Sequence, residues 1–295
     1  MPRAEQTNTP DNGPSAIGKF AMSIDVEDYF QVWAFSDIVT RDSWDGYKLR
    51  VGETTRRCLD LFERNDVRAT FFTLGWVAER DKSLIREIVD RGHELASHGY
   101  DHTKVNQQSR EEFAADIKKT KAMLEDIGGI AVRGYRAAGF SIDASTPWAH
   151  EVLIEAGYEY SSSSHPIAHD HYGDAQASQL PFFPVEGHHF IEAPVATTDL
   201  FGKRISTAGG GWYRAFPRLI TDKLIQRAAN RLDGPVIFYF HPWEIDPEQP
   251  RLKRASLKSK IRHYINLGAM ESKLDKTLTA YPWRRIDQCL ALETA

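Results

Sequence analysis

Short apolar runs alternate with segments of helical spacing, and this alternation limits the folds open to the chain. Apolar runs predict buried strands at Lys19–Ile24, Val67–Leu74, Ile130–Tyr135 and Pro235–Phe240. Helical spacing predicts helices over Gly52–Asn65 and Ser83–Arg91, and a capping box at Ser109–Glu112 opens a third that runs through Leu124 and is closed by Gly128 and Gly129. Repeated strand–helix units imply parallel strands and an α/β architecture. We predict a distorted or incomplete (β/α) barrel.

Length and composition fit one large domain. The 295 residues include 41% hydrophobic and 26% charged residues, as in ordinary globular proteins. We expect a disordered tail over residues 1–18 and a single domain over 19–295, with a C-terminal extension from about residue 247. The net charge of −4 argues against a general nucleic-acid binder. The sequence shows no apolar core of a signal peptide and no membrane span, so we expect a cytoplasmic protein.

Candidate chemical residues gather at the predicted strand ends. His98 and His102 are four residues apart, a spacing at which one helical turn or a tight turn lets both imidazoles bind one metal ion. Asp25, Glu27 and Asp28 follow the first strand and offer a carboxylate ligand and a base. A catalytic metal, which leaves positions open for water and substrate, fits this set better than a structural one.

Two further residues complete the ingredients of metal-assisted hydrolysis. His241 follows the strand Pro235–Phe240 and can supply the acid that protonates a leaving group. Arg136 follows the strand Ile130–Tyr135 and can hold a catalytic carboxylate in its ionised form. Each residue alone has an ordinary structural explanation. Their shared order at strand ends predicts an active site.

The chain resembles the polysaccharide deacetylases of carbohydrate esterase family 4, the NodB-homology domain, over roughly Phe20 to Asp246. The segment from Gly92 to His102, with Ala69–Phe72 before it, resembles the metal-binding motif of this family. The resemblance makes His98 and His102 metal ligands, Asp25 the catalytic base, Arg136 its partner and His241 the general acid. The segment His241–Asp246 resembles the subgroup found at bacterial exopolysaccharide and exosortase loci.

Three departures from the family pattern leave questions open. Val26 separates Asp25 from the next acid, so the carboxylate ligand is Glu27, on the same side of a strand as Asp25, or Asp28 if the strand ends early. Ala138 stands where the family has a proline after its arginine. No acid lies near Ser161–Ser164 to orient His241, so Glu244, Asp246 or a serine must do so.

The resemblance implies a metal-dependent N-deacetylase that acts on an amino sugar in a bacterial polysaccharide or its lipid-linked precursor. Zn²⁺ suits two imidazoles and a carboxylate, and Co²⁺ or Ni²⁺ also fits such a site. One alternative is an allantoinase-like hydrolase of a cyclic amide or ureide. A second is a glycan-binding module without catalysis.

The remaining expectations concern partners. Tyr29, Trp212, Tyr213 and Trp243 lie near the suspected site in sequence and are candidates to stack on sugar rings. The segment Arg251–Arg262 is basic, and contact with a phosphate of a membrane surface or a lipid-linked glycan is one interpretation; a solvated helix end or loop is the other. The sequence predicts no nucleic-acid partner.

Overall fold

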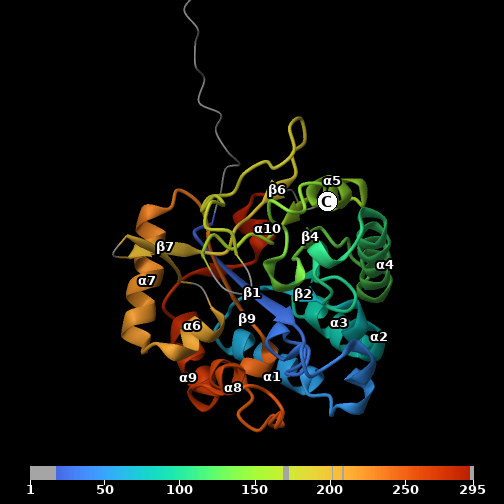
Figure 1. Cartoon of the computed structure of the whole chain (residues 1–295). Helices are drawn as coiled ribbons and strands as arrows, with labels where there is room; N and C mark the ends of the chain where they lie inside the picture. Colours follow the sequence, from blue (N-terminus) through green and yellow to red (C-terminus); the bar gives the residue numbers. More distant parts are fainter. Residues whose placement is uncertain (1–17, 169–172, 201, 208, 293–295) are drawn as a thin grey trace, which may run out of the picture.

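The fold is an eight-stranded, parallel sheet that curls into an open barrel with helices around it (Figure 1). The computed structural model describes residues 18–168, 173–200, 202–207 and 209–292. The tail predicted over residues 1–18 therefore lies, except for Gly18, outside the described residues. In the described part of the chain, no helix has the length and apolar character needed to cross a membrane.

The strands of the main sheet are β1 (Phe20–Val26), β2 (Thr70–Thr73), β3 (Glu94–Ser97), β4 (Gly134–Tyr135), β5 (Tyr160–Ser161), β6 (Ile191–Glu192), β9 (Val236–Phe240) and β10 (Trp283–Arg284). Their order is β10-β1-β2-β3-β4-β5-β6, with β9 also paired to β1. Strands β7 (Thr197–Leu200) and β8 (Lys203–Ser206) form a separate antiparallel hairpin.

The barrel is incomplete, as one of the two predicted forms has it, and its gap lies between β6 and β9. Ala196, shortly after β6, donates a backbone hydrogen bond to Ile237 of β9 at 3.1 Å, and this contact spans the gap. Because every pair in the main sheet is parallel, the carboxyl ends of the strands share one edge. That edge collects the polar residues predicted at the strand ends.

The helices are α1 (Val51–Arg64), α2 (Gly75–Arg80), α3 (Lys82–Asp90), α4 (Arg110–Gly128), α5 (Ala149–Glu155), α6 (Gly210–Ala215), α7 (Arg218–Arg231), α8 (Leu257–Tyr264), α9 (Leu267–Leu278) and α10 (Ile286–Cys289). Short 3₁₀ turns lie at Trp33–Phe35, Arg41–Gly46, Val105–Gln107, Ala138–Phe140 and Pro242–Ile245. Helices α4 and α5 cover one side of the sheet, and α7 lies on the other side (Figure 1).

Local signals set the helix ends well. The Ser109 side chain accepts a hydrogen bond from Glu112 N at 3.1 Å, and the Glu112 carboxylate accepts one from Ser109 N at 2.8 Å, so the predicted capping box is present. Gly129 ends α4 in the left-handed conformation with φ of 67°. The helix runs past the predicted end at Leu124 to Gly128.

Two predicted strands are shorter than their apolar runs. Only Gly134 and Tyr135 of the run Ile130–Tyr135 pair with neighbours, because Val132 N donates to the Glu125 side chain and Ile130 is exposed. The run Val67–Leu74 contributes Thr70–Thr73, since Val67 N still bonds to Phe62 O in the turn after α1. Tertiary pairing, which the apolar pattern does not encode, sets these lengths.

Candidate metal and proton-transfer site

Glu27, His98 and His102 converge at the carboxyl edge of the sheet. One ligand atom from each lies within 4.8 Å of the others. Glu27 is the first residue after β1, and His98 is the first residue after β3. His102 lies in the turn that follows. Gly99 and His102 both have a positive φ, 73° and 60°, and these angles bend the chain back toward His98. The four-residue spacing therefore works through a tight turn.

Hydrogen bonds orient the ligand atoms toward one point. His98 Nδ1 bonds to the Arg136 carbonyl oxygen at 2.8 Å, which leaves Nε2 to face the cluster. His102 Nε2 lies 3.1 Å from Glu27 Oε2, a buried oxygen that accepts no hydrogen bond from the described residues. A buried carboxylate oxygen without a donor and two nearby imidazole nitrogens form a donor set that fits a divalent cation.

Electrostatics at the cluster favour neutral imidazoles. Burial, followed by the effect of His98, lowers the pKa of His102 well below its ordinary value. Burial also lowers the pKa of His98, against the attraction of Asp25. Only the neutral form of histidine binds a metal, so both rings are in the ligating form at neutral pH. Burial raises the pKa of Glu27 to about 7 even though His241 opposes that shift, and a bound cation would stabilise its carboxylate.

Asp28, the other candidate ligand, faces away from the cluster. Its Oδ2 accepts hydrogen bonds from the backbone N–H of Arg50 at 2.7 Å and of Val51 at 2.9 Å. Its Oδ1 accepts one from Tyr29 N at 2.9 Å. Both oxygens of Asp28 thus satisfy backbone donors, two of them at the start of α1. Of the two alternatives for the carboxylate ligand, the geometry favours Glu27.

Arg136 holds Asp25 beside the cluster. The Arg136 guanidinium is fully buried and donates to Asp25 Oδ1 at 2.7 Å. It also donates to Ser23 Oγ, to Ser162 O and to Ser162 Oγ, each at 2.9 Å. Its carbon Cζ lies 4.0 Å from the centre of the Phe72 ring. These hydrogen bonds hold the Arg136 guanidinium in place. Arg136 therefore fixes Oδ1 of Asp25, while Oδ2 faces His241.

His241, the residue after β9, faces the carboxylates of Asp25 and Glu27. Its Nε2 lies 3.3 Å from Glu27 Oε1 and 3.9 Å from Asp25 Oδ2. Its Nδ1 bonds to Glu244 Oε1 at 2.8 Å, within the 3₁₀ turn that follows β9. Burial lowers the pKa of His241, but Glu27 and Glu244 outweigh burial and raise it to about 9. His241 is therefore protonated at neutral pH and able to donate a proton.

The residue that orients His241, left open by the sequence, is Glu244. Asp246 instead forms an ion pair with Arg50, with bonds of 2.7 and 2.9 Å. Ser162 accepts a hydrogen bond from Arg136, and Ser163 Oγ accepts one from Ala137 N. These serines therefore bond to the segment that contains Arg136.

The sequence did not predict Arg214, which binds the oxygen of Glu244 that does not contact His241. Arg214 Nε donates to Glu244 Oε2 at 2.6 Å, and both side chains are buried. Arg214 also donates to the carbonyl oxygens of His263 and Ile265. The pKa of Glu244 is lowered, since Arg214 and His241 together outweigh the burial that would raise it. An arginine 30 positions from its partner leaves no local signal.

The four aromatic candidates have different surroundings. Tyr29 and Tyr213 are each 1% exposed, and the Tyr213 hydroxyl bonds to Thr277 at 2.7 Å. The prediction that these two tyrosines bind substrate is therefore corrected, because core packing covers both rings. Trp243 stacks on the His241 ring, with centroids 5.2 Å apart, and is itself buried. Trp212 is exposed and stacks on Phe216.

Comparison with known proteins identifies the part of the chain that contains the two histidines. Residues 42–161 match the family model described as polysaccharide deacetylase, and residues 162–291 match a domain of unknown function, DUF3473. Residues 42–161 are therefore similar to polysaccharide deacetylases. This first matched region contains His98, His102 and Arg136, whereas the second contains His241, Glu244 and Arg214.

Curated relatives are also similar to part of the chain. A peptidoglycan-N-acetylglucosamine deacetylase of Bacillus cereus is 31% identical over 100 residues, which cover 34% of this chain and 36% of the relative. The match thus spans about a third of that protein's length. Deacetylases for peptidoglycan and for chitin are both among the relatives.

Solved structures confirm the fold. A crystal structure from Mycobacterium smegmatis assigned to the polysaccharide deacetylases aligns with a TM-score of 0.56 at 20% identity, over 96% of this chain and 93% of that one. The Puue allantoinase aligns with a TM-score of 0.59 at 15% identity, over 95% and 93% of the two chains. The predicted distorted barrel of the NodB type is therefore confirmed.

Proposed function

We propose that this protein is a metal-dependent hydrolase that removes the N-acetyl group from an amino sugar of a bacterial polysaccharide or its lipid-linked precursor. One observation carries the proposal. A donor set for one cation, Glu27 with His98 and His102, lies beside a carboxylate held by Arg136 and an imidazole held by Glu244. Amide hydrolysis needs these three components within reach of one acyl carbon. The deacetylase relatives support the same reaction class.

A bound divalent cation, for which we propose Zn²⁺ with Co²⁺ or Ni²⁺ as alternatives, would polarise the acetyl carbonyl and lower the pKa of a water molecule. Asp25 is the proposed base. Its Oδ1 is fixed by Arg136, so Oδ2 remains to accept the proton of the attacking water. Arg136 forms a buried ion pair with this carboxylate.

His241 is the proposed acid. Its Nδ1 bonds to Glu244, so the proton on Nε2 faces Asp25 and Glu27, where the nitrogen of a leaving amine would sit. Donation from Nε2 to that nitrogen breaks the amide bond and releases a free amine and acetate. Glu244 and Arg214 keep the ring in the orientation for this transfer.

Acetate release is the direct test. The protein is incubated with N-acetylated glucosamine oligomers, peptidoglycan fragments, lipid-linked saccharides and allantoin, with and without a chelator. We expect acetate from at least one acetylated glycan, loss of activity with the chelator, and recovery on addition of Zn²⁺, Co²⁺ or Ni²⁺. Ring opening of allantoin without acetate release would instead favour the cyclic-amide hydrolase, and glycan binding without any acetate would favour a binding module.

Metal analysis separates the ligands from the proton-transfer groups. We expect His98→Ala to lose both metal and activity, and Asp25→Asn to retain metal but lose turnover by roughly 10²–10⁴. His188→Ala is the matched control, because His188 is an exposed histidine outside the cluster. Retention of metal and activity in His98→Ala would contradict the proposal. The exopolysaccharide subgroup indicated by His241–Asp246 would be supported by a preference for exopolysaccharide substrates.

A further inference from the structure

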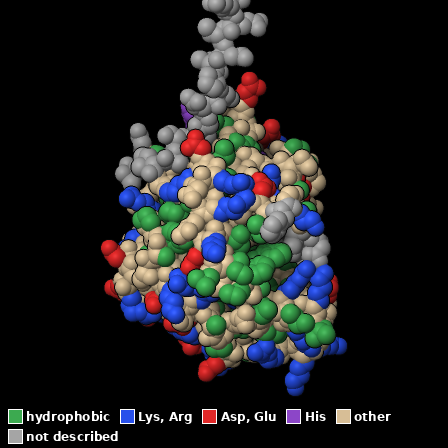
Figure 2. Space-filling model, turned by 90° about the vertical axis from the view of Figure 1, so that its left-hand side faces the viewer, with side chains coloured by type: hydrophobic (Ala, Val, Ile, Leu, Met, Phe, Trp, Pro, Cys, Tyr) green, Lys and Arg blue, Asp and Glu red, His purple; other side chains and the backbone are tan. Residues whose placement is uncertain are grey.

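Large exposed apolar side chains are concentrated on one part of the surface. Of the ten such side chains in the described residues, six belong to α6, α7, α8 or the residue after α6: Trp212, Phe216, Leu219, Ile220, Leu257 and Ile261. Leu219 is 71% exposed, and Trp212 stacks on Phe216 with ring centroids 6.0 Å apart. Figure 2 looks onto the α7 side of the molecule and shows hydrophobic side chains gathered among lysines and arginines. An apolar patch of this kind marks a contact surface.

The same region is strongly basic although the whole chain carries a net charge of −4. Helix α7 contains Arg218, Lys223, Arg227 and Arg231 against a single acid, Asp222, which pairs with Arg218. The segment Arg251–Arg262, before and within α8, contains six basic residues and no acid. This concentration of positive charge would attract a polyanionic surface.

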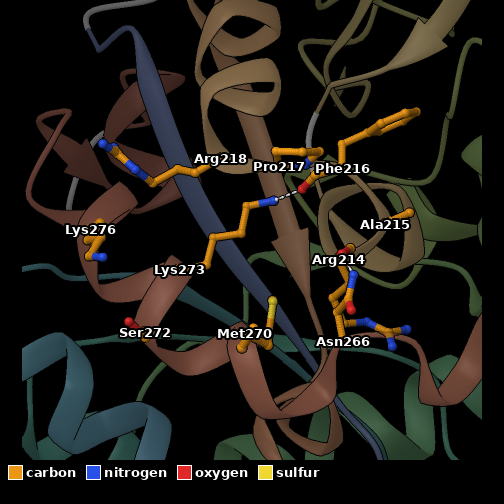
Figure 3. Close-up of a pocket in the computed structure, with 11 residues that line it drawn as sticks. Arg214, Ala215, Phe216, Pro217, Arg218, Asn266, Met270, Ser272, Lys273 and Lys276 are labelled. Atoms are coloured by element: carbon orange, nitrogen blue, oxygen red, sulfur yellow. Dashed lines mark hydrogen bonds between the residues drawn. The ribbon is translucent and has the colours of Figure 1, made fainter.

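A basic pocket of about 580 Å³ lies beside the apolar residues, between α6 and α9 (Figure 3). Phe216, Arg218, Lys273 and Lys276 contribute to its lining. Lys273 donates to the Phe216 carbonyl oxygen at 2.7 Å, as the dashed line in Figure 3 marks. The pocket therefore combines an aromatic wall with cationic groups, the chemistry that a lipid headgroup phosphate and its first carbons require.

The acids of α9 do not neutralise this pocket. Glu271 forms an ion pair with Arg57 at 2.7 Å, and Asp275 accepts a hydrogen bond from Asn65 at 2.9 Å, so both are directed toward α1. Lys273 and Lys276 of the same helix line the pocket. Helix α9 thus separates its charges, with Lys273 and Lys276 on the side of the pocket that Phe216 lines.

We propose that this basic-apolar face, defined by Trp212, Phe216, Leu219 and Ile220 with Arg218, Lys273 and Lys276, docks the protein on an anionic phospholipid bilayer. The apolar residues enter the interfacial region and the cations bind lipid phosphates. A bilayer satisfies both features at once, since it presents hydrocarbon beneath a layer of negative charge. The face is close to the candidate site, because Arg214 of α6 bonds to Glu244, which holds His241. Membrane docking does not rest on the proposed deacetylation.

Vesicle flotation tests the proposal. The full chain is mixed with vesicles of phosphatidylcholine alone or of phosphatidylcholine with phosphatidylglycerol, at low and high salt. We expect binding to the anionic vesicles at low salt, weakened by high salt, and at least about tenfold weaker binding to neutral vesicles. Neutralising one cation in Lys276→Gln should weaken partitioning by about fivefold.

Matched variants locate the docking face. Ile220→Glu is compared with Ile130→Glu, because these isoleucines are 44% and 39% exposed and Ile130 follows α4 on the other side of the molecule (Figure 1). Lys276→Gln is compared with Lys118→Gln on α4, where Lys118 is also exposed. Only Ile220→Glu and Lys276→Gln should reduce vesicle binding. Circular dichroism checks that each variant is folded.

Three results would overturn the proposal: no binding to anionic vesicles, equal loss in Ile220→Glu and Ile130→Glu, or displacement from vesicles by inorganic phosphate at a matched phosphate concentration. The last would indicate a small-anion site in the pocket without bilayer docking. Because binding is measured without substrate, a failure here leaves the acetate-release test unaffected.

Discussion

Glu244→Gln tests whether the carboxylate behind His241 is part of the catalytic apparatus. Glu244 Oε1 accepts hydrogen bonds from His241 Nδ1 at 2.8 Å and from His241 N at 3.0 Å, and Oε2 accepts from Arg214 at 2.6 Å. The amide keeps the size of the side chain but loses the charge and one acceptor. The substitution therefore removes orientation and electrostatic support from His241 without creating a cavity.

Two magnitudes follow from this geometry. A positioned proton donor contributes roughly 10²–10⁴ to a rate. Because Trp243 still stacks on the His241 ring, we expect only part of that contribution to be lost and kcat to fall about 10–100-fold. Arg214 is left buried without its carboxylate, which costs about 3 kcal/mol of unfolding free energy, the lower end of the range for a broken buried ion pair. Metal content should not change.

The assay combines acetate release, metal analysis and denaturant unfolding of Glu244→Gln, Arg214→Met and the double variant. If Arg214 acts through Glu244, the double variant should lose no more activity than Glu244→Gln alone, so the two effects are not additive. The double variant should also regain stability relative to Glu244→Gln, since no buried charge remains unpaired. Unchanged kcat in Glu244→Gln, with metal and fold intact, would refute the role given to this carboxylate.

Three further substitutions probe the supporting structure. Burial raises the pKa of Glu94 to about 8 from its ordinary 4.5, so the folded chain holds a proton that the unfolded chain releases. The unfolding free energy should therefore fall as the pH rises from about 5 to 8. In thermal melts, the stability of Glu94→Gln should depend less on pH than that of the wild type. Arg136→Met leaves Asp25 buried without its counter-ion and should cost about 3–5 kcal/mol in denaturant unfolding. In Gly209→Ala the new Cβ would lie 1.6 Å from Tyr239 O at a φ of +115°, so we expect a loss of about 3 kcal/mol or more, visible as a lower melting temperature than the wild type.

The residues predictable from the sequence are those whose positions depend on local structure. Asp25 lies one residue before the end of β1 and Arg136 directly follows β4, and parallel pairing brings these strand ends to one edge of the sheet. His98 and His102 are four residues apart in one turn, so their spacing, taken together with the acids after the first strand, predicts a shared ligand site. Glu244 was one of three alternatives for the group that orients His241. Its position three residues after His241 suits a bond across a turn, but this spacing does not exclude the other two.

Residues that depend on tertiary packing could not be predicted. Arg214 reaches Glu244 only because α6 packs against the end of α8 and the residues after it, where the Arg214 guanidinium donates to the carbonyl oxygens of His263 and Ile265. Tyr213, the neighbouring residue, was expected to contact substrate but points into the core toward Thr277 of α9. Adjacent residues of one helix thus have opposite outcomes, and no pattern in the sequence distinguishes them before the helices are placed.

Val26 explains why the carboxylate ligand should be Glu27 and gives the last prediction. The residue is fully buried and belongs to β1, so the strand continues past Asp25 and directs Val26 into the core. Asp25 and Glu27, two apart, then both reach the carboxyl edge, while Asp28 turns back to bind the first N–H groups of α1. We therefore expect Glu27→Gln to lose metal with little change in unfolding free energy. Asp28→Asn should keep its metal but lose about 1 kcal/mol of unfolding free energy, because the start of α1 loses part of its hydrogen bonding. Metal content measured beside denaturant unfolding separates the two roles, and loss of metal in Asp28→Asn with full retention in Glu27→Gln would reverse the assignment.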